Sequence, residues 1–562
     1  MLRNLFEYLI ILHSGLFDRN YYLLNYPDVR QADLNPIFHF VKKGWKEGKN
    51  PSVLFNTSFY LSKNPDVKAA GINPLFHYIR NGKKEGRVIN DQQEEIRGRS
   101  VKRYFDDFDN KFSPLVSIVV PNYNHVSFLN QRLDSIYNQT YKNFEIILLD
   151  DFSSDGSVEI LQNYYDSNKE NTRLFVNAQN SGNTFQQWQK GITAANGDLI
   201  WVAESDDFCD PDFLEKLVPF FFDESVMLSY AHSIFVDQYG NPSSFSYESY
   251  LSDINSDFLE SPYIRTAHEE VNSALGFKNT IPNASAVVFR KPNDEFPLFN
   301  NEDWKNMKVC GDWIFYLEIL KGGKVGYTNE TQNYFRFHTH NASSSRLVQA
   351  KYYKEHEAVA TWIAYSYNVD KILLEKNYNI IKQYYKKQMK NNRFKNYSSL
   401  YDINYIKECK EKRLPNILMV IFGFILGGGE ILPIHLANKL REKGAVVTVL
   451  NFGYGFQNEG VRKMLHPQIP VINYSENMDL KQIVIDYGIE CVHTHHASME
   501  NLIAKSKISE EFNITHVATM HGMYEMMENN DQEIMINNKS VDHWCYIAEK
   551  NLIPLIMRPS PE

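Results

Sequence analysis

Three stretches between residues 116 and 207 decide the fold of this chain. Residues 116–124 read VSIVVPNYN, residues 144–151 read FEIILLDD, and residues 197–207 read GDLIWVAESDD. In each stretch a short apolar run ends in acidic or amide side chains, as a buried strand does when it stops at a polar edge. Because ligands gather outside the carboxyl ends of parallel strands in an open α/β sheet, the three ends predict one shared site.

Clustered acidic side chains indicate the chemistry expected at this edge. Asp150 and Asp151 follow the second strand, and Glu204, Asp206 and Asp207 follow the third. Like charges packed together are unfavourable, so such a cluster needs a positive counterpart. A divalent cation that bridges a diphosphate is the natural candidate. An acidic pair after a strand is also a common helix cap, so the prediction rests on the ordered set and not on one pair.

The three motifs, in this order and spacing, resemble the nucleotide-binding half of family 2 glycosyltransferases, which have the GT-A fold. The family commonly reads PTYN, VDDGSTD and DSDD where this chain reads PNYN, LDDFSSD and ESDD. Two later segments, VCGDWIF at 309–315 and YFRFHTHNAS at 334–343, also match family patterns. The predicted fold class is therefore α/β, with a GT-A nucleotide-sugar domain over residues 114–345.

The resemblance assigns a role to each matching side chain. Asp312, which opens a helix, corresponds to the general base of the family, although the usual Glu-Asp pair is Gly-Asp here. Asp207 corresponds to the main metal ligand, with Asp206 and His338 beside it around Mg²⁺ or Mn²⁺. The implied donor-binding residues are Pro121, Asn122, Tyr123, Asp151, Glu204, Asp206 and His338.

The resemblance also implies a reaction. A sugar would move from a nucleotide-diphosphate donor, with inversion, to a hydroxyl of a growing bacterial surface polysaccharide or glycolipid, and Asp312 would accept the hydroxyl proton. The acceptor would be a saccharide or a lipid-linked saccharide, and other proteins of polysaccharide assembly are candidate partners. The alternative is a catalytically inactive carbohydrate-binding or scaffold protein of the same machinery, with the N-terminal repeats as its working surface.

Residues 1–90 contain a tandem repeat with a period of 38 residues. Pro27 recurs as Pro65, and the register is kept throughout the two copies. Helix patterns broken by Asn-Pro predict a compact helical unit stacked on its copy. His39 and His77 occupy equivalent positions in aromatic stretches, and core packing is favoured for both over metal binding. The polar residues 91–113 are typical of a linker.

Two further segments follow the predicted GT-A domain. Residues 346–412 have helical periodicity and little glycine, which predicts a helical linker. The pattern of residues 413–562 predicts a partial Rossmann-like unit with a glycine turn. The glycines lack the spacing of dinucleotide-binding and P-loop motifs, so neither type of cofactor is predicted. This unit resembles the N-terminal half of family 4 glycosyltransferases, which have the GT-B fold, and covers one half of such an enzyme. The resemblance implies either that the chain is a fragment of a longer protein or that this unit is a remnant used for binding. His493 and His495 share a strand face, but no third zinc ligand has suitable spacing.

Composition excludes several classes of protein. The chain of 562 residues has a net charge of −9, which argues against broad nucleic-acid binding. Its five cysteines have no paired spacing, so neither a disulfide framework nor a zinc knuckle is predicted. The N-terminus lacks a cleavage pattern and the longest apolar run is too short to span a bilayer. The expected location is the cytoplasm, with any membrane contact peripheral and at the inner face.

Overall fold

The computed structural model describes most of residues 7–82, residues 87 and 89, and then 112–338, 350–388, 396–520 and 540–546. Within these ranges, residues 9, 13, 15, 18, 33–34, 53–54, 253, 255–258 and 477 are not described. The chain divides into two compact units, residues 1–109 and 110–562. Nearly all of the predicted linker 91–113, and residues 339–345 of the predicted GT-A domain, lie outside the described residues.

The N-terminal unit consists of short helices that recur 38 residues apart. They are α2 (Arg19–Asn25), α3 (Pro27–Gln31), α4 (Pro36–His39) and the π-helix η1 (Phe40–Gly44), followed by α5 (Thr57–Lys63), α6 (Pro65–Ala69), α7 (Pro74–His77) and the π-helix η2 (Tyr78–Gly82). His77 lies 3.0 Å from the Tyr60 hydroxyl, and His39 lies 3.0 Å from that of Tyr22. A Cβ at Gly82 would lie 2.1 Å from the Tyr60 hydroxyl oxygen. Glycine at this position therefore leaves the space in which Tyr60 contacts His77.

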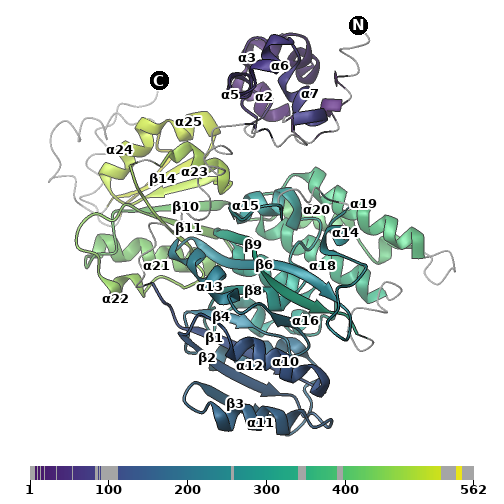
Figure 1. The fold of residues 1–562 in the computed structure, drawn as a ribbon. Helices are drawn as coiled ribbons and strands as arrows, with labels where there is room; N and C mark the ends of the chain where they lie inside the picture. The colour runs from purple at the N-terminus through teal and green to yellow at the C-terminus, as the bar shows by residue number, and fades with distance from the viewer. Residues whose placement is uncertain are drawn as a thin grey trace. The chain divides into compact units, whose positions relative to one another are not determined.

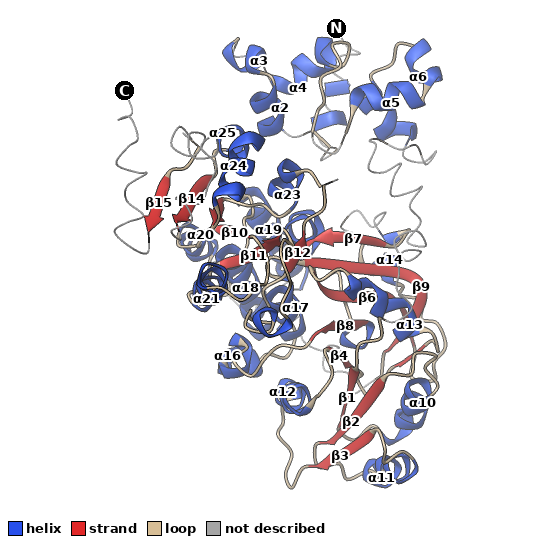
Figure 2. Cartoon of the chain, turned by 90° about the vertical axis from the view of Figure 1, so that its left-hand side faces the viewer, coloured by secondary structure: helices blue, strands red, loops and turns tan. Residues whose placement is uncertain are grey.

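The second unit begins with a mixed sheet whose first half is parallel. Strands β1 (Val116–Asn122), β2 (Phe144–Asp150), β3 (Thr172–Val176) and β4 (Leu199–Val202) lie in the order β3-β2-β1-β4 (Figure 1). Figure 2 shows α12 (Thr184–Ala194) on one face of these strands and α10 (Val126–Tyr137) and α11 (Ser157–Ser167) on the other. Because both faces are covered, β1 is buried along its whole length, which explains its continuous apolar run.

The same sheet continues beyond β4 with strands of mixed direction. These are β8 (Val287–Arg290), β6 (Val226–Val236), β9 (Lys324–Arg336) and β5 (Phe208–Cys209), with β7 (Tyr263–Thr266) paired to β9. Strand β6 runs parallel to β9, whereas β8 is antiparallel to both β4 and β6. Short helices between them are α13 (Phe213–Leu217), α14 (Tyr247–Tyr250), α15 (Ala267–Glu270) and α16 (Glu302–Lys305). The sheet is thus the mixed, GT-A-like sheet of an α/β protein.

Four longer helices complete the core around this sheet. They are α17 (Gly311–Leu320), α18 (Ala350–Ser366), α19 (Lys371–Gln388) and α20 (Ile403–Glu411). Ile363 of α18 and Ile406 of α20 belong to the same hydrophobic cluster as Val119 of β1 and Phe315 of α17. The segment 346–412, which the sequence predicts as a helical linker, therefore contributes helices to the core of the GT-A-like part.

A second sheet of six parallel strands follows, in the order β12-β11-β10-β13-β14-β15. Its strands are β10 (Asn416–Ile421), β11 (Val446–Asn451), β12 (Val471–Asn473), β13 (Cys491–Thr494), β14 (Thr515–Met520) and β15 (His543–Tyr546). Its helices are α21 (Gly428–Glu442), α22 (Glu459–Arg462), α23 (Leu480–Asp486), α24 (Ala497–Ser506) and α25 (Ile508–Phe512). Arg462 pairs with Glu224 at 2.8 Å, which links this sheet to the first one. Among the described residues, no helix has both the length and the apolar character needed to cross a bilayer.

Candidate active site

The ends of β1 and β2 are joined by a small network of polar side chains. Asn122 lies opposite Asp150 in the strand register, and its amide donates to the Asp150 carboxylate at 2.9 Å. The Ser153 hydroxyl accepts from the Asn122 amide at 3.2 Å and from the Asn124 backbone N–H at 2.9 Å. Of the predicted donor-binding residues at the end of β1, Pro121 and Asn122 are buried, whereas the Tyr123 side chain is 48% exposed.

Asp151 is buried and surrounded by donors from the protein itself. Its carboxylate accepts from the Asn177 amide at 2.6 Å, the Gln187 amide at 3.0 Å, and both the backbone N–H and the hydroxyl of Ser181. In this structure Asp151 thus holds the segment that leads into α12. The next residue, Phe152, is 56% exposed and has a φ of 69°, where the related family commonly has glycine.

Glu204 begins the acidic segment after β4. Its carboxyl group accepts a hydrogen bond from the Trp188 indole N–H at 2.8 Å. Burial, followed by the charge of Asp206, raises the pKa of Glu204 to about 8. At neutral pH the group is therefore mostly protonated, so it adds little charge to the site.

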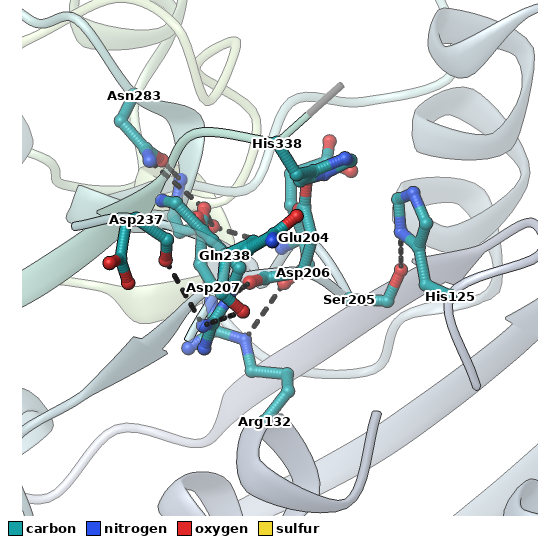
Figure 3. Close-up of polar contacts among 12 residues, drawn as sticks. His125, Arg132, Glu204, Ser205, Asp206, Asp207, Asp237, Gln238, Asn283 and His338 are labelled. Carbon is teal, nitrogen blue, oxygen red and sulfur yellow. Dashed lines mark hydrogen bonds and ion pairs between the residues drawn. The ribbon is translucent and has the colours of Figure 1, made fainter. Parts of the chain in front are cut away.

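Asp206 faces two histidines that come from distant parts of the chain. His338, just past the end of β9, lies with Nε2 2.9 Å from the Asp206 carboxylate. His125, just before α10, is oriented by a 2.8 Å hydrogen bond between its Nδ1 and the Ser205 hydroxyl (Figure 3). One ligand atom from each of His125, Asp206 and His338 lies within 4.8 Å of the other two. Burial opposes ionisation of Asp206, but the hydrogen bond from His338 and the nearby His125 keep its pKa below the ordinary value.

Asp207 has a different environment from its neighbour. Its carboxylate accepts from the Asn283 amide at 2.9 Å, the Ser285 hydroxyl at 2.6 Å and the Arg336 backbone N–H at 2.9 Å. The side chain is 2% exposed, and burial together with the charge of Asp206 raises its pKa. The structure therefore uses Asp207 to join the β4 end to β9 and to the segment before β8. Asp206, and not Asp207, faces the histidines.

Asp312 lies in the first turn of α17, as the sequence predicts. Burial raises the pKa of Asp312 to about 7. Tyr316, one helical turn on, has its pKa raised by burial and then by the charges of Asp312 and Glu204.

The Gly311-Asp312 pair has a packing reason. A Cβ at position 311 would lie 2.3 Å from ring carbons of Phe185, which is the second residue of α12. The backbone carbonyl of Gly311 accepts from the Trp304 indole N–H at 2.8 Å. A side chain at position 311 would require the Phe185 ring to move, which disfavours the glutamate that the related family usually carries there.

Sequence reasoning assigned no definite role to several residues of this site. His125 stands alone in a loop, and its only signal was its place one residue after the PNYN motif. Arg336 is 1% exposed and its guanidinium donates to the Asp206 backbone carbonyl at 2.7 Å, so it holds the acidic turn in place. In the second sheet, the rings of His493 and His495 stack 4.3 Å apart, but they form no three-ligand group with other described residues.

Part of this chain is similar in sequence to known glycosyltransferases. Residues 117–274 match the sequence model described as Glycosyl transferase family 2. An uncharacterized glycosyltransferase of Haemophilus influenzae is 39% identical over 128 residues, which cover 23% of this chain and 50% of that protein. The chain thus spans half the length of this relative. The putative teichuronic acid biosynthesis glycosyltransferase TuaG of Bacillus subtilis is 26% identical over 266 residues, which cover 46% of this chain and 95% of that protein.

Among solved structures, TarS residues 1–349 from S. aureus, in complex with UDP-GlcNAc, aligns with 53% of this chain and 90% of that one. The identity is 16% and the TM-score is 0.40. The sequence match includes His125 and Asp206 of the strand-end cluster, whereas His338 lies beyond it. Residues 117–274 are therefore the part of the chain that is similar in sequence to glycosyltransferase family 2.

Proposed function

We propose that the GT-A-like part of this protein transfers a sugar from a nucleotide-diphosphate donor to a hydroxyl group, with inversion at the anomeric carbon. The observation that carries the proposal is the group formed by His125, Asp206 and His338 at the strand ends of a family 2 domain. The relation to TuaG supports a bacterial surface polysaccharide or glycolipid as the acceptor.

The residues at the strand ends fit a divalent cation. His125 and His338 supply imidazole nitrogens and Asp206 supplies a carboxylate oxygen, and the three ligand atoms are close enough to share one ion. Imidazole ligands suit Mn²⁺ better than Mg²⁺, which prefers oxygen alone, so Mn²⁺ is the favoured ion of the two. When bound, the ion would offset the negative charge that develops on the leaving diphosphate.

Asp312 performs the proton transfer in the proposed reaction. The acceptor oxygen attacks the anomeric carbon, its proton passes to the Asp312 carboxylate, and the bond from that carbon to the phosphate oxygen breaks with the electron pair on the diphosphate. A pKa of about 7 suits this role, because the carboxylate is ionised in part at neutral pH and is basic enough to hold the proton. Tyr123, whose side chain is exposed at the strand ends, would contact the donor base.

A donor screen tests the proposal. The full chain is incubated with UDP-, GDP- and dTDP-sugars, with and without Mn²⁺, and release of the nucleoside diphosphate is measured. Release from at least one donor that depends on Mn²⁺ is the expected result. If no donor turns over and calorimetry detects no nucleotide binding, the chain is instead the inactive carbohydrate-binding or scaffold protein.

A further inference from the structure

Helix α18 holds the main chain that leads to Asp312. The Glu355 carboxylate accepts three consecutive backbone N–H groups, from Lys308 at 2.9 Å, Val309 at 2.7 Å and Cys310 at 3.0 Å. Cys310 is the N-cap residue of α17 and Asp312 is the second residue of that helix. One buried carboxylate thus fixes the backbone immediately before the proposed base.

Neighbouring side chains of α18 bind the same segment. Lys351 donates to the Asn306 carbonyl at 2.8 Å, and the His356 ring lies with Nδ1 3.4 Å from the Cys310 sulfur. Glu355 is 4% exposed and His356 is 8% exposed. Residues 306–310 are therefore held along one side by a single helix face, with Glu355 at its centre.

The opposite side of this segment is also fixed. The Lys308 ammonium donates to the Gly182 carbonyl at 3.0 Å, and the Phe185 ring closes the space over Gly311. The segment before Asp312 is thus held between α18 and the start of α12. A carboxylate accepts several hydrogen bonds at once. Glutamine, the neutral side chain of the same length, would turn its NH₂ group, a donor, toward one of these backbone N–H donors.

We propose that Glu355 is a positioning residue that sets the place of the Asp312 carboxylate relative to the strand-end site. The inference rests on the proposed role of Asp312 as the base. Glu355 lies outside the segment that matches the family, and its carboxylate accepts from the backbone of residues 308–310. Its loss should move Asp312 and leave the donor site intact, and misplacement by about 1 Å is enough to cost roughly 100-fold in rate.

Glu357 on the same helix supplies a matched control. Its carboxylate accepts the Asp402 backbone N–H at 2.7 Å and pairs with Lys354 at 2.7 Å, so it holds the start of α20 and not the Asp312 segment. Glu355→Gln and Glu357→Gln remove the same charge from the same helix. Glu355→Asp keeps the charge and shortens the reach, which separates geometry from electrostatics.

The experiment compares kcat, donor KM and nucleotide–Mn²⁺ affinity in the three variants and in Asp312→Asn. Glu355→Gln and Glu355→Asp should lower kcat at least about 10-fold, with donor KM and nucleotide–Mn²⁺ affinity within about twofold of wild type. Glu357→Gln should leave all three values unchanged. Wild-type kcat in both Glu355 variants, or an equal loss in Glu357→Gln, overturns the inference.

Hydrogen exchange gives a readout that does not depend on activity. The amides of residues 308–310 should lose protection in both Glu355 variants and keep it in Glu357→Gln. Unchanged protection in the Glu355 variants would show that the carboxylate does not fix this segment. If Asp312→Asn keeps wild-type transfer, the proposed base is wrong, whereas an inactive Asp312→Asn beside fully active Glu355 variants rejects the positioning role alone.

Discussion

At the scale of single residues, two adjacent aspartates have separate tasks. Asp206 faces His125 and His338, whereas both oxygens of Asp207 are occupied by the protein. The family resemblance favours Asp207 as the main metal ligand, but the hydrogen bonds around it favour a structural role. The two environments also shift the pKa values in opposite directions, because His338 and His125 lower that of Asp206 whereas burial and the charge of Asp206 raise that of Asp207.

Substitution of each aspartate distinguishes these roles. Asp206→Asn should weaken Mn²⁺ binding at least about 10-fold with little change in stability, because a charged ligand is lost from a partly exposed position. Asp207→Asn should keep Mn²⁺ binding and lower the free energy of unfolding by about 1–3 kcal/mol, because an amide donor would face buried donors. Electron paramagnetic resonance of Mn²⁺ and urea unfolding measure the two effects. Loss of Mn²⁺ binding in Asp207→Asn at unchanged stability would restore Asp207 as the ligand.

The assignment of Asp312 as the base predicts one pH effect and one mutational effect. A general base acts when ionised, so kcat should increase about tenfold per pH unit below about 7 and level off above it. Asp312→Asn should lose transfer by at least about 100-fold and keep nucleotide–Mn²⁺ binding. A pH–rate profile and calorimetry check both, and a profile that is flat from pH 5 to 8 would place the base elsewhere.

The same carboxyl group affects stability in the opposite direction. Its pKa is higher in the folded protein than the ordinary value of 3.8, so the folded state holds a proton that the unfolded chain has lost. Stability from this group is therefore present at low pH and is lost as pH rises from about 4 to about 7. Asp312→Asn removes that loss, so the variant should gain stability relative to wild type between pH 5 and pH 8.

At the scale of elements, α17 is fixed at its first residue by its neighbours. Its start lies against the Phe185 ring, and the backbone before it is held by Glu355 of α18. The sequence predicts a helix opening at Asp312 because the motif is local. It does not predict that α18, from the supposed linker, belongs to the same core, because amphipathic periodicity does not specify the partner of a helix.

Gly311→Ala tests the packing at this junction. The added methyl group would overlap the Phe185 ring, so the free energy of unfolding should fall by about 1–3 kcal/mol. Phe185→Leu in the same chain should recover part of that loss. Gly428→Ala is the control, because a Cβ there meets nothing within 4 Å and the residue begins α21. Equal effects of the two alanine substitutions would show that position 311 has free space.

At the scale of the whole second unit, a buried ionic group joins the two sheets. Glu318 of α17 is 2% exposed and lies 2.5 Å from Lys321 and 3.6 Å from Arg441 of α21. The helix that carries Asp312 is therefore attached at its other end to the second sheet. The resemblance of residues 413–562 to half of a family 4 enzyme stays a prediction. The contact between Arg441 and Glu318 gives the second sheet a structural role, because it supports the helix that carries Asp312.

Removal of Arg441 should destabilise this junction. Arg441→Met leaves the buried Glu318 with Lys321 alone, and breaking a buried ion pair costs about 3–5 kcal/mol. Lys439→Met, on the same helix, breaks an exposed pair with Glu442 and should cost no more than about 1 kcal/mol. Thermal and urea unfolding of both variants provide the comparison. Similar small effects would mean that the two sheets are held together without this ionic group.

The sequence by itself determined the features that are written within a few adjacent residues. Apolar runs ending in polar groups predicted the strands and their polar edge. The local motif predicted that a helix begins at Asp312, and the 38-residue spacing predicted the recurring helices of residues 19–82. These signals are local because strand alternation, helix caps and turns depend on neighbours along the chain.

Only the tertiary structure decided which side chains meet. Asp206 and His338 are 132 residues apart, and His125 joins them because β1, β4 and β9 end at one edge of the sheet. Strand order brings Asn283 and Arg336 to the Asp207 carboxylate. Helix packing brings Glu355 to the segment before Asp312. A single sequence does not encode such distant pairings in its periodicity, because burial constrains the kind of residue at a position and not the identity of its partner.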